Sequence, residues 1–422
     1  MSTEIVSTGN RADIAHPATY AAGVPYAEFA RLRREEPVSW VPEAPLWRRS
    51  GEGRILSQGP GFWAVTTHEG VVAASRQPEV FSSGRQGAFL ADPRTTADLE
   101  QARQLLVNMD APQHARVRRL VTAVFTPRAI RALGESVTAH ARNLVERAVR
   151  QEECDVVADL AAELPLLVLA DLLGLPREDR HLLYQWSNNL VGFDDPEYGG
   201  GDVEAYRRTF FEAFQYALSV ADERRRAPRE DLMTLLATGE ADGRRLTDRE
   251  FCNFWLLLVV AGNETTRHLI TGSVLALVDN PTQRERLVAD DTLLPSAVEE
   301  LLRWVSPIMQ FRRTAIVDTE LHGTPIAAGD KVVLWYASAN RDAAVFEAPD
   351  ELRLHRNPNP HLSFGMGPHF CLGAHLARLE ARAMLRELAP HLSRFRLSGQ
   401  VVRLESNFVN GVKSLPGSFT EQ

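Results

Sequence analysis

The stretch FGMGPHFCLG, residues 364–373, decides our interpretation of the fold. It closes a segment from 357 to 371 that is rich in Pro, Gly, Asn and His and has no helical or strand periodicity. A long irregular segment inside a compact domain usually has a function. Gly365, Gly367 and Gly373 permit backbone conformations closed to other residues, and they let the chain approach a flat ligand closely.

Cys371 ends this loop, where a helix is expected to begin. The positive end of a helix dipole and the exposed N–H groups of its first turn both favour a thiolate over a thiol. A thiolate is a strong ligand for a soft transition metal. A lone cysteine is more often a small buried apolar residue, so the residue type alone leaves both interpretations open.

A second unusual stretch is AGNETT, residues 261–266, which interrupts an apolar helical segment that begins near Phe254. Glycine in a helix costs about 1 kcal/mol relative to alanine, and a buried Glu or Thr needs a hydrogen-bond partner. Either the helix reaches the surface here, with Glu264 and Arg267 in solvent, or these groups take part in chemistry. The apolar run is too short for a membrane span, which needs about 20 residues.

Helical periodicity dominates the rest of the chain, including residues 129–149, 164–173 and 376–392. Strand patterns are fewer and lie at 61–66, 320–326 and 331–336. The Asp-, Gly- and Pro-rich segment 193–202 is expected to form a loop and is a candidate moving lid. We therefore expect one mainly α domain with small β-sheets over residues 1–422, in which 1–25 form an extended N-terminal segment.

Composition excludes several classes of protein. The net charge of −8 gives no basic field for nucleic acid, and the only lysines are Lys331 and Lys413. Three widely spaced cysteines form neither a disulfide framework nor a zinc-finger pattern, which fits a reducing compartment. The first residues lack the pattern of a signal peptide, so a cytoplasmic location is expected.

Together these motifs resemble the cytochrome P450 family. Phe-x-x-Gly-x-His-x-Cys-x-Gly at 364–373 is similar to its haem-binding loop, AGNETT to its acid–alcohol pair, and Glu300-x-x-Arg303 to its buried brace. The resemblance extends from about Tyr26 to the end of the chain. It implies the cytochrome P450 fold and haem b as cofactor. One departure is Leu352, where the family usually has Phe.

The resemblance also implies roles for individual residues. Cys371 would be the thiolate ligand of the iron, with Phe364 packed beside the sulfur. The haem propionates would be held by His114, Arg118, Arg313, His361 and His369. Gly262 would leave room for dioxygen, Thr265 would donate a hydrogen bond to it, and Glu264 would relay protons. Arg356 would complete the brace of Glu300 and Arg303.

The implied reaction inserts one oxygen atom from dioxygen into a C–H bond of a hydrophobic small molecule. No flavin or nicotinamide motif is present, so electrons would come from a separate ferredoxin and its reductase, docking near Arg118 and Arg119. Strings at 108–110, 340–342 and 356–361 resemble bacterial members that oxidise sterol side chains, methyl-branched lipids or terpenoids. Apolar positions expected to contact the substrate are Phe89, Val259, Ile308, Phe311, Phe408 and Val409.

Three alternatives stay open at this point. The haem could serve natural-product tailoring, such as polyketide or peptide hydroxylation, epoxidation or oxidative ring closure. It could also serve a non-catalytic gas sensor, although no output domain is recognised. Finally, the chain could bind no haem, which would require the match of the cysteine loop to be a coincidence.

Overall fold

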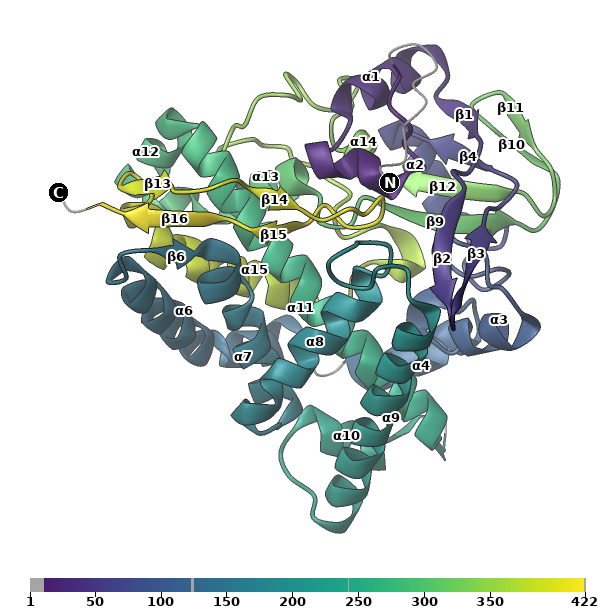
Figure 1. Cartoon of the computed structure of the whole chain (residues 1–422), viewed down its shortest axis with the longest axis horizontal. Coiled ribbons are helices and arrows are strands. Elements are labelled where there is room, and N and C mark those ends of the chain that lie inside the picture. The colour runs from purple at the N-terminus through teal and green to yellow at the C-terminus, as the bar shows by residue number, and fades with distance from the viewer. Residues whose placement is uncertain (1–10, 123–124, 242, 421–422) are drawn as a thin grey trace.

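The computed structural model describes residues 11–122, 125–241 and 243–420. Its longest helix, α11 (Asp248–Asp279), runs diagonally through the centre of the molecule (Figure 1). Thr247 and Glu250 form a capping box at its start, which satisfies the free N–H groups of the first turn. The polar stretch 261–266 lies inside this helix without breaking it.

The other helices fill most of the molecule around α11 (Figure 1). They are α1 (Tyr26–Glu35), α2 (His68–Ser75), α3 (Thr96–Ala102), α4 (Gln113–Thr122), α5 (Pro127–Ala132), α6 (Gly134–Val149), α7 (Glu163–Leu173), α8 (Arg180–Val191), α9 (Val203–Arg226), α10 (Leu232–Thr238), α12 (Pro281–Ala289), α13 (Leu294–Val305), α14 (Tyr336–Ala339) and α15 (Ala374–Leu388).

Short strands form the remaining part of the fold. The largest sheet has the order β1 (Val38–Val41), β4 (Phe62–Val65), β12 (Lys331–Trp335), β9 (Gln310–Ala315) and β5 (Phe81–Ser82). The smaller sheets pair β2 (Leu46–Ser50) with β3 (Gly53–Ser57), β7 (Glu240–Ala241) with β8 (Arg244–Arg245), β10 (Thr319–Leu321) with β11 (Thr324–Ile326), β14 (Val402–Arg403) with β15 (Val412–Ser414), and β16 (Pro416–Phe419) with β13 (Phe395–Leu397) and β6 (Cys154–Asp155). The expected mainly α fold with small sheets is confirmed.

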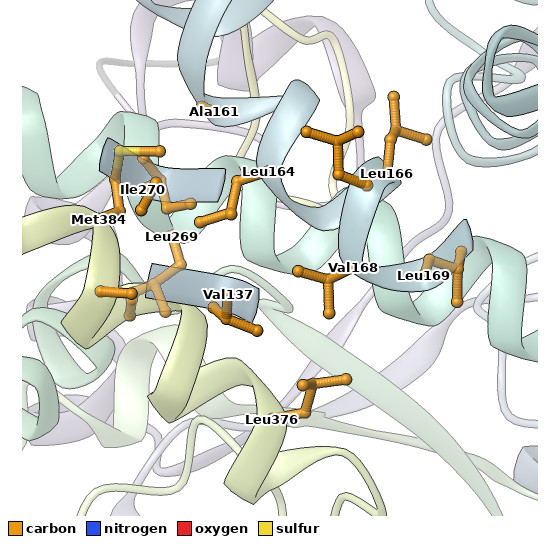
Figure 2. Close-up of a cluster of buried hydrophobic side chains, with 14 of the residues drawn as sticks. Val137, Ala161, Leu164, Leu166, Val168, Leu169, Leu269, Ile270, Leu376 and Met384 are labelled. Carbon is orange, nitrogen blue, oxygen red and sulfur yellow. The ribbon is translucent and has the colours of Figure 1, made fainter. Parts of the chain in front are cut away.

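The main hydrophobic core lies where four helices meet. Figure 2 shows Leu164 and Val168 of α7, Leu269 of α11 and Leu376 of α15 converging, with Val137 of α6 beside them. Residues three or four apart share one face of a helix, so each helix contributes an apolar stripe. This core holds α15, and hence the loop before it, against the middle of α11.

Several expectations need correction. The segment 129–149 is two helices, because α5 ends at Ala132 and α6 begins at Gly134. Residues 17–22 form a 3₁₀ helix with a buried Tyr20, so residues 11–25 are not an extended arm, while residues 1–10 lie outside the described part. No helix within the described ranges is both long and apolar enough to cross a membrane.

Candidate functional site

The cysteine loop has the irregular conformation that its glycines predict. Gly365 and Gly367 have positive φ angles of 66° and 71°, a region that disfavours other residues. A Cβ atom on Gly367 would lie 2.5 Å from the carbonyl oxygen of Ser75, so the close approach of α2 also requires glycine here. Gly373 differs, because its φ is −84° and no atom crowds it.

Cys371 lies just before α15 and is tied to the start of its loop, since its N–H donates to the carbonyl oxygen of Phe364 at 2.9 Å. Burial raises the pKa of the Cys371 thiol, although the N–H of Gly373 and the guanidinium groups of Arg118 and Arg378 act in the opposite direction. The effect of burial on the pKa of Cys371 therefore outweighs the expected preference for the thiolate form. The groups that would stabilise a thiolate are nevertheless in place.

Four of the predicted propionate residues lie close together. The rings of His114 and His369 are 4.4 Å apart between centroids, and Arg118 donates to the carbonyl oxygen of Phe370 at 2.6 Å. The pKa of His369 is lowered to about 2, mainly by burial and then by Arg313, His114 and Arg118. The Nε2 atom of His114 is buried and has no hydrogen-bond partner among the described residues. A cluster of basic side chains that includes an unpartnered, buried ring nitrogen fits an anionic ligand.

His361 has a different environment. Its Nε2 lies 3.1 Å from Oε2 of Glu299, and Arg378 binds both oxygens of that carboxylate at 2.7 Å. Burial would raise the pKa of Glu299, but Arg378 and His361 lower it to about 2. The guanidinium of Arg378 also lies 4.5 Å from the centre of the Phe364 ring. His361 is thus paired with a carboxylate of its own, and its predicted propionate contact finds no support in this geometry.

Glu264 and Arg267 of α11 are buried, so the helix does not reach the surface at these two residues. Glu264 pairs with Arg267 and accepts a hydrogen bond from Ser187 of α8 at 3.0 Å. His268 Nδ1 accepts from the N–H of Val412, which leaves its Nε2–H to donate to Glu264 at 3.3 Å. Burial would raise the pKa of Glu264, but Arg267, His268 and Ser187 lower it. The acid is therefore held as a carboxylate.

Thr265 and Gly262 are partly exposed, unlike Glu264. The Thr265 hydroxyl donates to the carbonyl oxygen of Ala261, one turn earlier, at 2.8 Å. A Cβ on Gly262 would lie 3.5 Å from a methyl group of Leu169, which is ordinary van der Waals contact. Contacts with other protein atoms therefore do not require glycine at position 262.

Five of the six predicted substrate residues come together from three distant segments. The ring of Phe408 lies 5.3 Å from Phe89 and 5.4 Å from Phe311, and Phe89 lies 6.2 Å from Phe311. Ile308 and Val409 form an isolated β-bridge beside them. Val259 is different, because it is fully buried in the main core, where it packs against other helices.

Comparison with known proteins agrees with these features. A family model described as Cytochrome P450 matches residues 202–413. A steroid C26-monooxygenase of Rhodococcus jostii is 40% identical over 404 residues, which cover 95% of this chain and 83% of that protein. This chain belongs to the cytochrome P450 family. A methyl-branched lipid omega-hydroxylase of Mycobacterium tuberculosis is 42% identical over 393 residues, covering 92% and 89% of the two chains.

Solved structures of other P450s have the same fold. A P450 from Mycobacterium marinum in complex with pseudoionone superimposes with a TM-score of 0.88 and 41% identity, covering 98% of this chain and all of that one. A P450 from Bacillus megaterium in complex with testosterone gives a TM-score of 0.81 with 33% identity, covering 94% and 98%. The chain is therefore a P450 monooxygenase with haem b as its cofactor, and the basic residues around His369, with the unpartnered Nε2 of His114 among them, fit that group.

The brace of the P450 forms as predicted. Arg303 donates to both oxygens of Glu300 at 2.7 and 2.8 Å, and Arg356 donates to the same carboxylate at 3.0 Å. Leu352, the departure from the family pattern, is buried in the main core. The smaller side chain at this position leaves the brace intact.

Sequence reasoning missed several partners of the predicted residues. Ser187 and Asn188 of α8 bind Glu264 and Arg267, yet they lie more than 70 residues away and have no motif of their own. His268 could have been inferred, because residues four apart in a helix are neighbours and Glu264 precedes it by four. Arg378 follows Cys371 by seven residues on α15 and could have been assigned to the loop on the same ground.

Proposed function

We propose that this P450 hydroxylates the terminal carbon of a methyl-branched aliphatic chain, either on a steroid or on a branched lipid. The observation that carries the proposal is the aromatic wall, defined as Phe89, Phe311 and Phe408. The names of two relatives support the choice, since ω denotes the terminal carbon of a chain and C26 is a terminal carbon of a sterol side chain.

Backbone hydrogen bonds hold the wall in place. The N–H of Arg312 donates to the carbonyl oxygen of Ala88 at 2.8 Å, and that of Met309 donates to Phe408 at 2.9 Å. Side chains on a braced backbone lose little further entropy when they bind a ligand. Aromatic rings without polar atoms recognise a ligand through buried apolar area, which suits a branched hydrocarbon chain.

Haem would be held by residues of the cysteine loop and by residues of other segments that lie next to it. We assign Cys371 as the iron ligand, Phe364 as its neighbour, and His114, Arg118, Arg313 and His369 as the propionate contacts. When bound, the haem supplies the chemistry that activates dioxygen with two electrons. Arg118 and Arg313 supply the positive charge that two propionates require, and His114 supplies an unused donor.

Protons would reach the site through α11. Glu264 is held as a carboxylate by Arg267 and lies next to a neutral His268, so it would take up and pass on a proton when its ion pair with Arg267 opens. The Thr265 hydroxyl is partly exposed, and its one proton, which is donated to the carbonyl oxygen of Ala261, would have to turn away from that oxygen to reach dioxygen. We assign Thr265 as the donor to dioxygen, Glu264 as the proton carrier and Gly262 as the residue that leaves room beside them.

Electrons would come from a separate ferredoxin and ferredoxin reductase, because no motif for flavin or nicotinamide was recognised. We place the docking face near Arg118 and Arg119, which belong to α4 next to the cysteine loop. The three cysteines are free in the structure, which suits the reducing cytoplasm where such partners operate.

The test is a titration of the purified ferric protein with a sterol ketone, a methyl-branched fatty acid, a monoterpenoid alcohol and a macrolactone. A saturable shift of the haem absorption band with the sterol or the branched acid, followed by a terminally hydroxylated product, is expected. A shift with the macrolactone alone would move the protein to natural-product tailoring and overturn the substrate class. Purified protein that takes up no haem would overturn the assignment of Cys371.

A further inference from the structure

The hairpin of β2 and β3 has an unusual outer face. The two strands pair in antiparallel register with Trp47 opposite Leu56 and Arg49 opposite Arg54. Alternate residues of a strand point to one face, so these four side chains share a face. All four are exposed, with Trp47 at 56% and Leu56 at 50%. Figure 1 shows the hairpin as a separate ribbon below β1 and β4.

Folding stability does not explain this face. Two arginines directly opposite each other repel and destabilise a strand pair. Arg49 has only a distant partner, Asp202 at 3.7 Å, and no carboxylate in the described ranges pairs with Arg54. The guanidinium of Arg54 lies 6.0 Å from the centre of the Trp47 ring, but such a contact at an exposed site contributes little to the fold. The arrangement is therefore expected to serve binding.

The inner face of the same hairpin is firmly attached. Arg48 is buried and donates to both oxygens of Asp194 at 3.1 Å, while its guanidinium lies 4.9 Å from the centre of the Phe193 ring. The N–H of Arg49 also donates to the carbonyl oxygen of Gly201 at 2.8 Å. The hairpin thus presents its outer face from a fixed position beside loop 193–202, the candidate lid.

We propose that Trp47, Leu56, Arg49 and Arg54 form a docking face for a lipid surface with anionic headgroups. Trp and Leu can enter the boundary between headgroups and acyl chains, and Arg can bind phosphate while its stem covers apolar surface. Arg49 and Arg54 are adjacent on this face, and Arg49 is only loosely paired with Asp202 at 3.7 Å, so both guanidinium groups can contact headgroup phosphates although the net charge of the chain is −8. Docking here would bring loop 193–202 to the lipid.

The test uses full-length holoprotein and sucrose-loaded vesicles that contain no substrate. Sedimentation with phosphatidylglycerol–phosphatidylcholine vesicles at low salt is expected, with much weaker binding to phosphatidylcholine alone. The double variant Trp47→Ser/Leu56→Ser should lower the partition coefficient about tenfold or more, because two apolar side chains no longer enter the interface. Arg49→Gln/Arg54→Gln should lower it by about tenfold or more and remove its dependence on salt.

Matched controls are Leu397→Ser and Arg150→Gln, which change exposed residues on β13 and at the end of α6. They are expected to bind like the unaltered protein. The proposal fails if the unaltered protein does not bind anionic vesicles, or if the hairpin variants bind as well as the controls. A concentration-dependent dimer that only the hairpin variants abolish would assign the face to a second copy instead. The substrate-induced spectral shift, measured separately, reports on the proposed reaction independently of this face.

Discussion

Ser187 donates a hydrogen bond to Oε1 of Glu264 across 3.0 Å and thereby joins α8 to the centre of α11. Asn263 in turn donates to the same hydroxyl at 2.7 Å, and the carbonyl oxygen of Tyr184 also lies within hydrogen-bonding distance of it, at 3.1 Å. A buried hydroxyl in such a network is costly to remove, because its partners are left without hydrogen bonds.

Replacing Ser187 with Ala should lower the free energy of unfolding by about 1–3 kcal/mol. The pKa of Glu264 should also rise, since the hydroxyl now stabilises its charged form. Urea unfolding at fixed pH measures the first effect. Ser219→Ala is the matched control, because that hydroxyl is exposed and, within the described part of the chain, binds only the carbonyl oxygen of Tyr216. Equal loss in both variants would contradict a special role for Ser187.

Thr265→Ala should separate electron use from product formation. The hydroxyl that we assign as a donor to dioxygen is removed, so more reduced oxygen should leave as hydrogen peroxide, and the fraction of electrons found in product should fall by about tenfold. The measurement compares consumption of reduced nicotinamide, peroxide and product in a reconstituted system. Thr265→Ser, which keeps the hydroxyl, should retain the coupling. Full coupling in the alanine variant would refute the assignment.

Glu380 should make the protein less stable as the pH rises. Its carboxyl is buried on α15, Oε2 has no partner in the described part of the chain, and burial raises its pKa from 4.5 to about 8. Between these values the unfolded chain releases the proton while the folded one retains it, so stability falls with increasing pH. Glu380→Gln carries no charge and should be more stable by up to about 3 kcal/mol at pH 7.

The advantage of Glu380→Gln should vanish below about pH 4.5, where both states of the unaltered protein hold the proton. Thermal unfolding across this pH range measures the difference. Glu387→Gln on the same helix is the control, since Glu387 pairs with Arg142 near the surface. A constant difference across the whole range would show that ionisation of Glu380 is not its source.

Lys331→Met should destabilise the protein by about 3 kcal/mol. The ammonium group is buried and bridges Glu43 and Asp92, with the latter 2.9 Å away, and it also donates to the carbonyl oxygen of Leu90. Without it, the largely buried carboxylate of Glu43 would lose its cation. Lys331→Arg retains the charge and should lose less stability than Lys331→Met. If calorimetry gives both variants the same midpoint, the ion pairs contribute little.

Arg118→Gln and His361→Gln should differ in their effect on haem binding. Arg118 belongs to the group of bases that we assign to the propionates, so its loss should speed the release of haem to a scavenging globin by about tenfold. His361 is paired with Glu299, so its replacement should change the release rate little. Equal acceleration by the two variants would restore the propionate contact of His361.

Some parts of this site could be read from local sequence and others could not. The cysteine loop was predictable because two of its glycines, Gly365 and Gly367, adopt positive φ angles, a demand that arises within the loop itself. The contact between His361 and Glu299 was not predictable, because Glu299 and Glu300 are adjacent in sequence. Successive residues of a helix point about 100° apart. Glu300 therefore joins the brace, while Glu299 turns towards His361.

Tertiary packing also decided which predicted substrate residues could meet a ligand. Phe89, Phe311 and Phe408 were candidates only because they are apolar and follow the family pattern, and the same holds for Val259. The difference lies in the packing around them. Val259 is enclosed by the helices of the main core, whereas Phe89 keeps 37% of its surface exposed. Residue type alone carries no information about that difference.

The two lysines have a practical consequence for handling the protein. Lys413 donates to Asp195 at 3.0 Å and to Glu197 at 2.7 Å, and it is partly buried, whereas Lys331 is fully buried. Burial would lower the pKa of Lys413, but these two carboxylates raise it, so its amine stays protonated and is a poor nucleophile. Reagents that attack lysine, such as activated esters or aldehyde cross-linkers, should therefore modify the two lysine side chains slowly in the folded protein. Rapid lysine labelling would in turn report that an ion pair has opened.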